Sequence, residues 1–211
     1  SKSLENKFGG FYGVNVSAIY YLNNNLSTYN DARRSQHILF KVNSGATDEE
    51  KAEVKEKAQE VLDKINAGEI SFEDAVSKYS EDTGSKDNKG DVGWDKLTSF
   101  VDEYQSALSG LNKGDVSQLV ESSYGYHIIK CTGYFHVDES VTSIDQVPKK
   151  IVSYIKNILK TQKESTAYSE WMSEYIEKAD IQINDMPKEV PYNVSLKGVT
   201  PSTGSSSTSS E

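Results

Sequence analysis

The sequence lacks the features of several protein classes. Cys131 is the only cysteine among 211 residues, so no disulfide can form within the chain. Its place inside an apolar stretch favours a buried structural thiol over a reactive one. No apolar run approaches the roughly 20 residues that a membrane-spanning helix needs. Residues 1–10 have neither the basic nor the apolar region of a signal peptide, so we expect any targeting sequence to be removed or to lie outside this sequence.

Positive charge is also scarce. The chain has 23 Lys and Arg against 32 Asp and Glu, a formal net charge of −9 and a pI near 5.0. Because binding to phosphate backbones requires clustered Lys and Arg, nucleic acid is not expected as a partner. The composition, with 36% hydrophobic residues and a mean hydropathy of −0.62, predicts a soluble, surface-rich protein with long polar helices.

Two of the three histidines lie in short apolar stretches that are far apart in the chain. His37 lies within SQHILFKV (35–42), and His127 lies within SSYGYHIIKCTGY (122–134). Both stretches are typical of β-strands, in which alternate side chains share a face. If the two strands are neighbours, cross-strand spacing brings the Cβ atoms of facing residues within about 5 Å. We therefore expect the two imidazoles to lie side by side on one face of a sheet.

Helices are predicted between these strands. Thr47 and Glu50 form a capping box that begins a helix running to about Ala67. Ser71 begins a short second helix, and a third is expected to begin near Ser99.

The remaining stretches complete a domain. Residues 80–94 are rich in Gly, Asp, Ser and Asn and predict a long loop. Residues 115–134 predict a hairpin that turns at 123–125. The order of strand, three helices and hairpin predicts an α+β fold, in which helices surround an antiparallel sheet.

The flanks differ in character from this domain. Residues 14–22 fit a strand or a buried helix. Residues 148–178 predict a helix of about thirty residues, which we expect to pack on residues 1–30 or on a second copy of the chain. Residues 181–185 predict a short strand. We therefore expect a helical flanking domain built from both chain ends. The predicted regions are the first part of the flanking domain (1–32), the α+β domain (33–136), the second part of the flanking domain (137–190) and a disordered Ser/Thr-rich tail (191–211).

Five motifs in order carry a resemblance to a known family: HILF, YSED, GDVGW, GDVS and YGYHIIK, with an aromatic helix before GDVS. The set closely resembles the parvulin family of peptidyl-prolyl cis-trans isomerases, over about half of the chain. The flanks look like those of PrsA-type foldases, which Gram-positive bacteria anchor outside the membrane. This resemblance implies an extracytoplasmic, cell-surface or membrane-anchored protein.

The resemblance also implies a site. Its catalytic residues would be the dual histidines His37 and His127, with Asp82 and Ser122 beside them. Its proline-binding residues would be Val92, Phe100 and Tyr104, the last two of which depart from the family's common Met and Phe, so that the pocket is expected to be tighter or more polar. The resemblance implies no metal and no cofactor. The expected partners are unfolded or partly folded exported polypeptides with X-Pro bonds, and a homodimer through the flanking helices is a second option.

Each of these residues also has a structural interpretation. His37 and His127 could be hydrogen-bonded core histidines, Asp82 a loop-capping carboxylate and Ser122 a turn residue. Phe100 and Tyr104 could be ordinary helix-face core residues. His136 lies beyond the motifs and is expected at the surface.

Three other functions remain open from the sequence. A domain that keeps the fold could bind unfolded chains as a chaperone without isomerising them. Two His and an Asp could form a non-haem iron site, although no short ligand spacing is present. An adhesion or scaffolding module of the cell envelope would leave the histidine pair unexplained.

Overall fold

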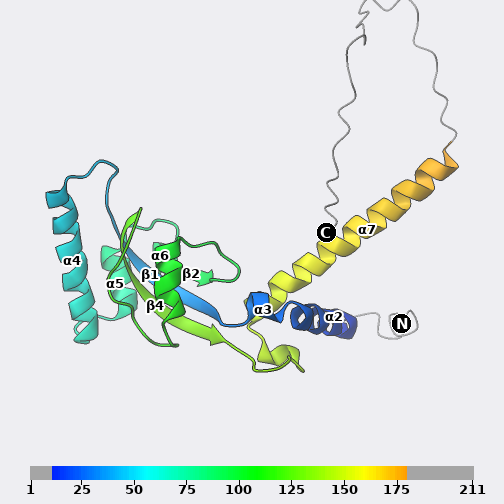
Figure 1. The fold of residues 1–211 in the computed structure, drawn as a ribbon, viewed down its shortest axis with the longest axis horizontal. Coiled ribbons are helices and arrows are strands. Elements are labelled where there is room, and N and C mark those ends of the chain that lie inside the picture. Colours follow the sequence, from blue (N-terminus) through cyan, green and yellow to red (C-terminus); the bar gives the residue numbers. More distant parts are fainter. Residues whose placement is uncertain (1–10, 180–211) are drawn as a thin grey trace, which may run out of the picture. The chain divides into compact units, whose positions relative to one another are not determined.

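A four-stranded antiparallel sheet is the centre of the structure, a computed structural model that describes residues 11–179 (Figure 1). The strand order across the sheet is β2-β1-β4-β3. The strands are β1 (Ala32–Lys41), β2 (Asp91–Trp94), β3 (Val120–Ser122) and β4 (Gly125–Phe135). The helices are α2 (Phe11–Asn24), α3 (Leu26–Tyr29), α4 (Asp48–Asn66), α5 (Phe72–Tyr79), α6 (Asp102–Ser109) and α7 (Lys149–Lys178), with short 3-10 turns η1 (Lys86–Asn88) and η2 (Ile144–Gln146).

The two central strands are the long ones. β1 pairs with β4 from Ala32 opposite Phe135 to Lys41 opposite Gly125. The predicted hairpin is confirmed, because β3 turns directly into β4. Gly125 makes this turn at φ +129°, and a Cβ there would lie 2.1 Å from the carbonyl oxygen of Phe40. Only glycine fits this close approach of two backbones.

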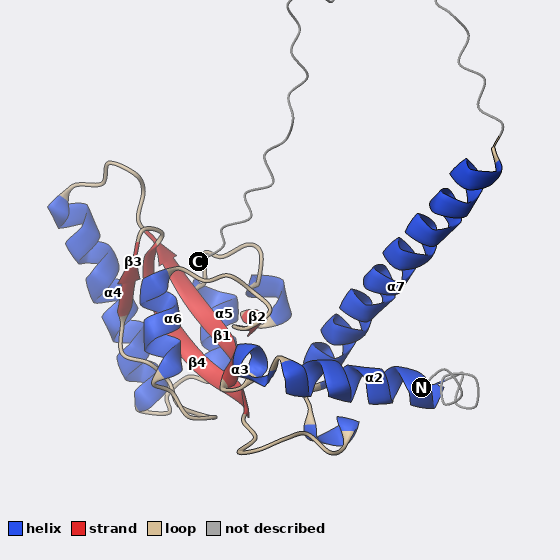
Figure 2. Ribbon diagram, turned by 45° about the vertical axis from the view of Figure 1, so that its right-hand side comes forward, coloured by secondary structure: helices blue, strands red, loops and turns tan. Residues whose placement is uncertain are grey.

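Helices cover both faces of the sheet (Figure 2). α4 and α5 pack on one face, and α6 packs on the other. The predicted capping box is confirmed: the Thr47 hydroxyl accepts from the Glu50 N–H, and the Glu50 carboxylate accepts from the Thr47 N–H. Ser71 likewise caps α5 by accepting from the Asp74 N–H. The α+β class and the antiparallel sheet with surrounding helices are therefore confirmed.

Three local predictions were wrong. Residues 91–94 are not loop but the edge strand β2, which pairs with β1 through Arg34 opposite Trp94. The polar stretch 23–32, NNNLSTYNDA, predicts a turn-rich connector, but it contains the short helix α3. α6 begins at Asp102 and not near Ser99, because Val101 stays extended as the N-cap and two acidic residues occupy the first helical turn, where the helix dipole favours them.

Helix α2 and the beginning of α7 share a hydrophobic core. Residues 14–22 are helical and not a strand. Leu22 of α2 and Ile151 and Ile155 of α7 are almost fully buried in one cluster, which also includes Trp94 and Phe135 at the end of the sheet. These contacts join both flanks to the sheet.

The chain divides into two compact units, residues 1–166 and 167–211. The predicted helix of about thirty residues is confirmed as α7, which has 30 residues and ends in the second unit. There, the side chains of Tyr168, Trp171 and Tyr175 are more than half exposed. The predicted strand 181–185 and the predicted tail lie outside the described residues. Among residues 11–179, no helix is both long enough and apolar enough to cross a lipid bilayer.

Candidate functional site

His37 and His127 are positioned by the central strands. In the β1–β4 register His37 lies opposite Ile129, and Leu39 lies opposite His127. The histidines are therefore diagonal neighbours on the face that α6 covers. Their Nδ1 atoms are 3.2 Å apart, and their rings are nearly parallel, with an angle of 19° between the planes. Both side chains are buried. Water therefore has little access to the ring nitrogens and does not compete with the contact between the two rings.

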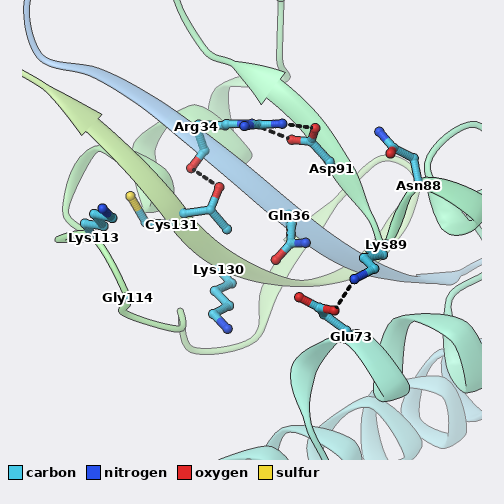
Figure 3. A pocket seen from close by; sticks show the side chains of 11 residues that line it. Arg34, Gln36, Glu73, Asn88, Lys89, Asp91, Lys113, Gly114, Lys130 and Cys131 are labelled. Atoms are coloured by element: carbon cyan, nitrogen blue, oxygen red, sulfur yellow. Dashed lines mark hydrogen bonds and ion pairs between the residues drawn. The ribbon is translucent and has the colours of Figure 1, made fainter. Parts of the chain in front are cut away.

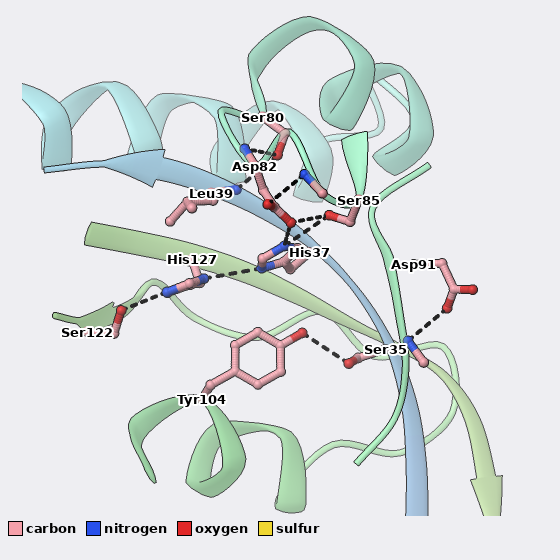
Figure 4. A network of polar contacts seen from close by, with 12 residues as sticks. Ser35, His37, Leu39, Ser80, Asp82, Ser85, Asp91, Tyr104, Ser122 and His127 are labelled. Carbon is pink, nitrogen blue, oxygen red and sulfur yellow. Dashed lines mark hydrogen bonds and ion pairs between the residues drawn. The ribbon is translucent and has the colours of Figure 1, made fainter. Parts of the chain in front are cut away.

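A continuous chain of polar contacts runs through this pair (Figure 4). At one end, the Ser122 hydroxyl lies 2.7 Å from His127 Nε2. At the other end, His37 Nε2 lies 2.8 Å from Asp82 Oδ2 and 3.2 Å from the Ser85 hydroxyl. Ser85 also donates a hydrogen bond to the same carboxylate oxygen. Four side chains from β3, β4, β1 and the loop after α5 thus form one network, with Ser85 supporting it.

The chemistry of the partners assigns the protons in this chain. An ionised Asp82 can only accept, so His37 Nε2 carries hydrogen and donates to it. In the neutral form of His37, Nδ1 then accepts from the Nδ1–H of His127. His127 Nε2 is consequently an acceptor, and the Ser122 hydroxyl donates to it. With His37 in this form, all donors point the same way, from Ser122 towards Asp82.

The electrostatics of the site support this assignment. Burial and, to a smaller extent, the nearby His37 lower the pKa of His127 to about 4, although Asp82 partly opposes the shift. His127 is therefore neutral at pH 7. Burial raises the pKa of Asp82, but hydrogen bonds from Ser85, His37 and the Gly84 N–H outweigh burial and bring it to about 2. Asp82 is therefore ionised at pH 7.

An apolar cluster adjoins the network. Tyr104 and Ile129 are buried in it, and Val92 and Phe100 pack against it while remaining partly exposed. The Tyr104 ring meets the two imidazoles edge-on, at centroid distances of 5.8 Å from His37 and 5.6 Å from His127. Phe100 lies 4.6 Å from the Tyr104 ring, centroid to centroid. The aromatic rings of Tyr104 and Phe100 therefore line the site next to the two imidazoles.

The hydroxyl of Tyr104 has its own partner. It lies 3.0 Å from the Ser35 hydroxyl, and both side chains are buried. Burial raises the pKa of Tyr104 well above its usual range, so the phenol stays protonated. The hydroxyl that distinguishes Tyr104 from Phe is thus bound to β1.

The structure brings all seven residues of the expected site into two adjoining groups. His37, Asp82, Ser122 and His127 lie in the polar network, and Val92, Phe100 and Tyr104 lie in the apolar cluster. His136 lies outside both groups, exposed between Asp31 and Asp138. Cys131 is a fully buried member of the apolar cluster, and burial raises the pKa of its thiol.

Sequence reasoning missed two polar residues of this region, Ser35 and Ser85. Alternation gave a signal for Ser35, which lies two residues before His37 on the same strand face. Ser85 lies three residues after Asp82 in a loop rich in Gly, Asp and Ser, and such residues commonly bond locally in turns. Nothing in the sequence shows, however, that this loop folds back on His37.

In residues 11–179 no group of three or more His, Cys, Asp or Glu side chains is placed to hold a metal ion.

Comparison with known proteins places this site within a recognised domain. Residues 37–133 match the family described as "Rotamase: PPIC-type PPIASE domain". The matched segment begins at His37 and contains every residue of the polar network and of the apolar cluster. Ser35, the partner of the Tyr104 hydroxyl, lies just before it.

Several known proteins resemble a larger part of the chain. Foldase protein PrsA of Oceanobacillus iheyensis is 33% identical over 151 residues, which cover 72% of this chain and 45% of the relative. Chaperone SurA of Photorhabdus laumondii is 31% identical over 151 residues, which cover 72% of this chain and 33% of the relative. The chain thus spans less than half the length of these curated relatives. The crystal structure of PrsA from Bacillus subtilis aligns with a TM-score of 0.46 and 26% identity, over 87% of this chain and 70% of that one.

Proposed function

We propose, from the premise that residues 37–133 of this chain are a parvulin domain of the PPIC type, that the protein is a peptidyl-prolyl cis-trans isomerase which assists the folding of exported polypeptides. The observation that carries the proposal is the unbroken polar chain from Ser122 through His127 and His37 to Asp82, beside a partly exposed apolar surface. A folded sheet needs no such buried network for stability alone.

The reaction requires positioning and not bond cleavage. An X-Pro bond isomerises over a barrier of about 18–20 kcal/mol that arises from amide resonance. A catalyst therefore holds the proline ring in an apolar slot, removes water from the amide and favours the twisted state. Val92 and Phe100, which are partly exposed, supply the accessible part of the proposed slot. The buried ring of Tyr104 packs against the Phe100 ring.

Asp82 acts in this proposal by orienting His37 and not by attacking the substrate. Its Oδ2 atom accepts from His37 and Ser85, and its Oδ1 atom accepts from the Gly84 N–H at 3.1 Å. A carboxylate engaged in this way is a weak nucleophile, as its low pKa also indicates. In this arrangement it fixes the orientation of both rings, so that a preorganised polar surface lies beneath the twisted amide.

Exchange spectroscopy by NMR on a short Ala-Pro peptide tests the isomerase activity. The native chain should accelerate cis-trans exchange, and His127→Ala should reduce the catalysed rate roughly tenfold, the effect of losing one good hydrogen-bonded partner. His136→Ala, an exposed histidine outside the network, is the matched control and should leave the rate unchanged. Equal rates for His127→Ala and His136→Ala would remove the proposed role of the dual histidines.

A chaperone without isomerase activity is the second candidate. On α7, the exposed rings of Tyr168, Trp171 and Tyr175 form a continuous aromatic strip, with centroid separations of 6.0 and 5.4 Å. Such a strip can contact apolar segments of an incompletely folded chain. In the NMR experiment, a chain that only binds would shift the peptide resonances without accelerating exchange.

Binding of unfolded clients by the flanking region is proposed on the same observation. The variant Tyr168→Gln/Tyr175→Gln should lose suppression of the aggregation of a denatured client protein. The control Tyr20→Gln/Tyr124→Gln removes two other tyrosines of similar exposure. Equal suppression by both variants would exclude the aromatic strip as the binding surface. The mass of the protein in solution tests the second option, a homodimer through the flanking helices.

The proposed location is outside the cytoplasm, at the cell surface, as the resemblance to anchored foldases implies. Treatment of intact cells with a protease tests this location. Degradation of the protein, with a cytoplasmic protein preserved in the same cells, is the expected result, and protection of the protein would contradict it.

A further inference from the structure

The sheet has a second polar surface on the face opposite the histidines. Side chains alternate along β1, so Arg34 and Gln36 point away from the face of Ser35 and His37. α4 and α5 cover this second face only where Ile38 and Phe40 lie. Beyond α5 the face is uncovered, and a hollow of about 430 Å³ lies over it (Figure 3).

The hollow crosses the sheet from one side to the other. Its lining includes Lys89 beside the edge strand β2, Arg34 and Gln36 on β1, Lys130 on β4, and Lys113 on the segment beyond β4. That segment is joined to β4 by the hydrogen bond from the Gly114 N–H to the Cys131 carbonyl, at 2.7 Å. Three strand spacings amount to roughly 14 Å. The hollow can therefore hold an extended peptide of about four residues.

The charges in this hollow are unbalanced. Arg34 is paired with Asp91 through two contacts, at 3.0 and 2.5 Å, and Lys89 is paired with Glu73 at 2.8 Å. Lys113 and Lys130 have no carboxylate within ion-pair distance among the described residues 11–179. The lining thus has two more positive than negative side chains, although the whole chain has a net charge of −9. A local excess of positive charge in an acidic protein selects a negatively charged ligand.

The arrangement of the cations indicates the form of this ligand. In Figure 3 the side chains of Lys113, Lys130 and Lys89 are spread along the hollow and do not converge on one point. A single phosphate or sulfate would contact only one of them. The amide side chains of Gln36 and Asn88, which also line the hollow, can donate to and accept from a peptide backbone.

We propose that this hollow is a binding groove for an extended, acidic segment of a polypeptide, with Lys113 and Lys130 pairing with its carboxylates. The groove is separate from the proposed isomerase site, since the sheet lies between them. A bound chain can engage it whether or not it contains proline. The groove would give the protein a preference among unfolded chains for those with Asp- and Glu-rich segments.

Fluorescence anisotropy with a labelled, proline-free decapeptide of alternating Glu and Ala tests the proposal. Lys113→Gln/Lys130→Gln removes the two charges that have no carboxylate partner among residues 11–179 and should weaken binding roughly tenfold. The matched control Lys55→Gln/Lys57→Gln removes two exposed charges from α4 and should bind as the native chain does. The corresponding decapeptide of Gln and Ala should bind weakly, and raising the salt concentration should reduce binding of the Glu peptide.

Several results would overturn the proposal. Equal binding of the Glu peptide to the two double variants would show that overall charge, and not the groove, decides the interaction. Equal binding of the Glu and Gln peptides would exclude recognition of carboxylates. Binding of inorganic polyphosphate that depends on Lys113 and Lys130, without binding of the Glu peptide, would assign a different ligand. Because the peptides contain no proline, none of these results depends on isomerase activity, and thermal unfolding of each variant checks that it is folded.

Discussion

Gly90 lies directly against the backbone of His37. The His37 N–H donates to the Gly90 carbonyl at 2.9 Å, and the Gly90 N–H donates to the Ser85 carbonyl at 2.8 Å. Gly90 has φ +76°, and a Cβ there would lie 2.5 Å from the His37 carbonyl oxygen. This glycine therefore joins the loop that carries Asp82 and Ser85 to the strand that carries His37.

Gly90→Ala should destabilise the protein and disturb the network. A left-handed conformation costs an alanine about 1–2 kcal/mol, and the clash with the His37 backbone adds roughly 1–3 kcal/mol. Gly68→Ala is the control, because Gly68 has a similar φ of +73° but nothing within 4 Å of the added Cβ. Urea denaturation measures both. A free energy of unfolding equally reduced in the two variants would show that the contact with His37 has no energetic effect.

The strand that the sequence analysis missed illustrates what local patterns cannot predict. β2 has four residues, and Gly93 within it has φ +85°. Its pairing with β1 also changes register between Ser35 and Gln36. No alternation marks so short and irregular a strand. It forms because β1 offers an unpaired edge, which is a tertiary effect.

The histidine pair illustrates the opposite case. Both imidazoles lie in regular strand sequence, where period-two alternation assigns a face to each residue. The expectation that the rings lie side by side required only that the strands be neighbours and antiparallel. The offset of two residues between His37 and His127 is a property of the β1–β4 register. These strands are far apart in the chain, so the offset could not be derived beforehand. The position of Ser85 depends on the fold of a whole loop, and the roles of all these residues in catalysis stay predictions.

Ser85→Ala should raise the pKa of Asp82. The Ser85 hydroxyl is the strongest of the hydrogen bonds that lower this pKa from its ordinary value to about 2. Without it, the carboxylate keeps only His37 and the Gly84 N–H as donors. Titration of the Asp82 carboxyl carbon by NMR measures the change. Ser77→Ala, an exposed serine that donates only to the Glu73 carbonyl, should leave the pKa of Asp82 as it is, and an unchanged pKa in Ser85→Ala would contradict the assignment.

Tyr104→Phe should affect stability more than catalysis. The Tyr104 hydroxyl bonds the buried Ser35 hydroxyl and does not reach the imidazoles. Removing it leaves Ser35 without this partner, which costs about 1–2 kcal/mol. Combining it with Ser35→Ala should recover part of that loss in a double-mutant cycle. A large fall in the rate of Ala-Pro exchange, with stability unchanged, would show instead that the hydroxyl acts on the substrate.

Ile151→Ala should test the core between the two flanks. Ile151 is fully buried with Leu22 of α2 in the cluster at the end of the sheet, so truncation leaves a cavity and should cost roughly 2–5 kcal/mol. Ile176→Ala removes the same atoms from a side chain that is 54% exposed and should have almost no effect. Thermal unfolding measures both variants. Similar melting temperatures for the two would show that the shared core contributes little to stability.

Stability should fall as the pH is lowered from about 6.5 to about 4, and His127 should account for part of this fall. Its pKa is about 4 in the folded protein, below the ordinary value of 6.5, because burial opposes its charge. In this range the unfolded chain binds a proton that the folded chain excludes, which removes about 3 kcal/mol in total. His127→Gln should therefore flatten the dependence of the free energy of unfolding on pH between these limits. His136 behaves oppositely, since hydrogen bonds to Asp31 and Asp138 raise its pKa, and His136→Gln should leave the fall in place. A His127→Gln protein that keeps the native slope would show that this imidazole takes up its proton in the folded state as readily as in the unfolded one.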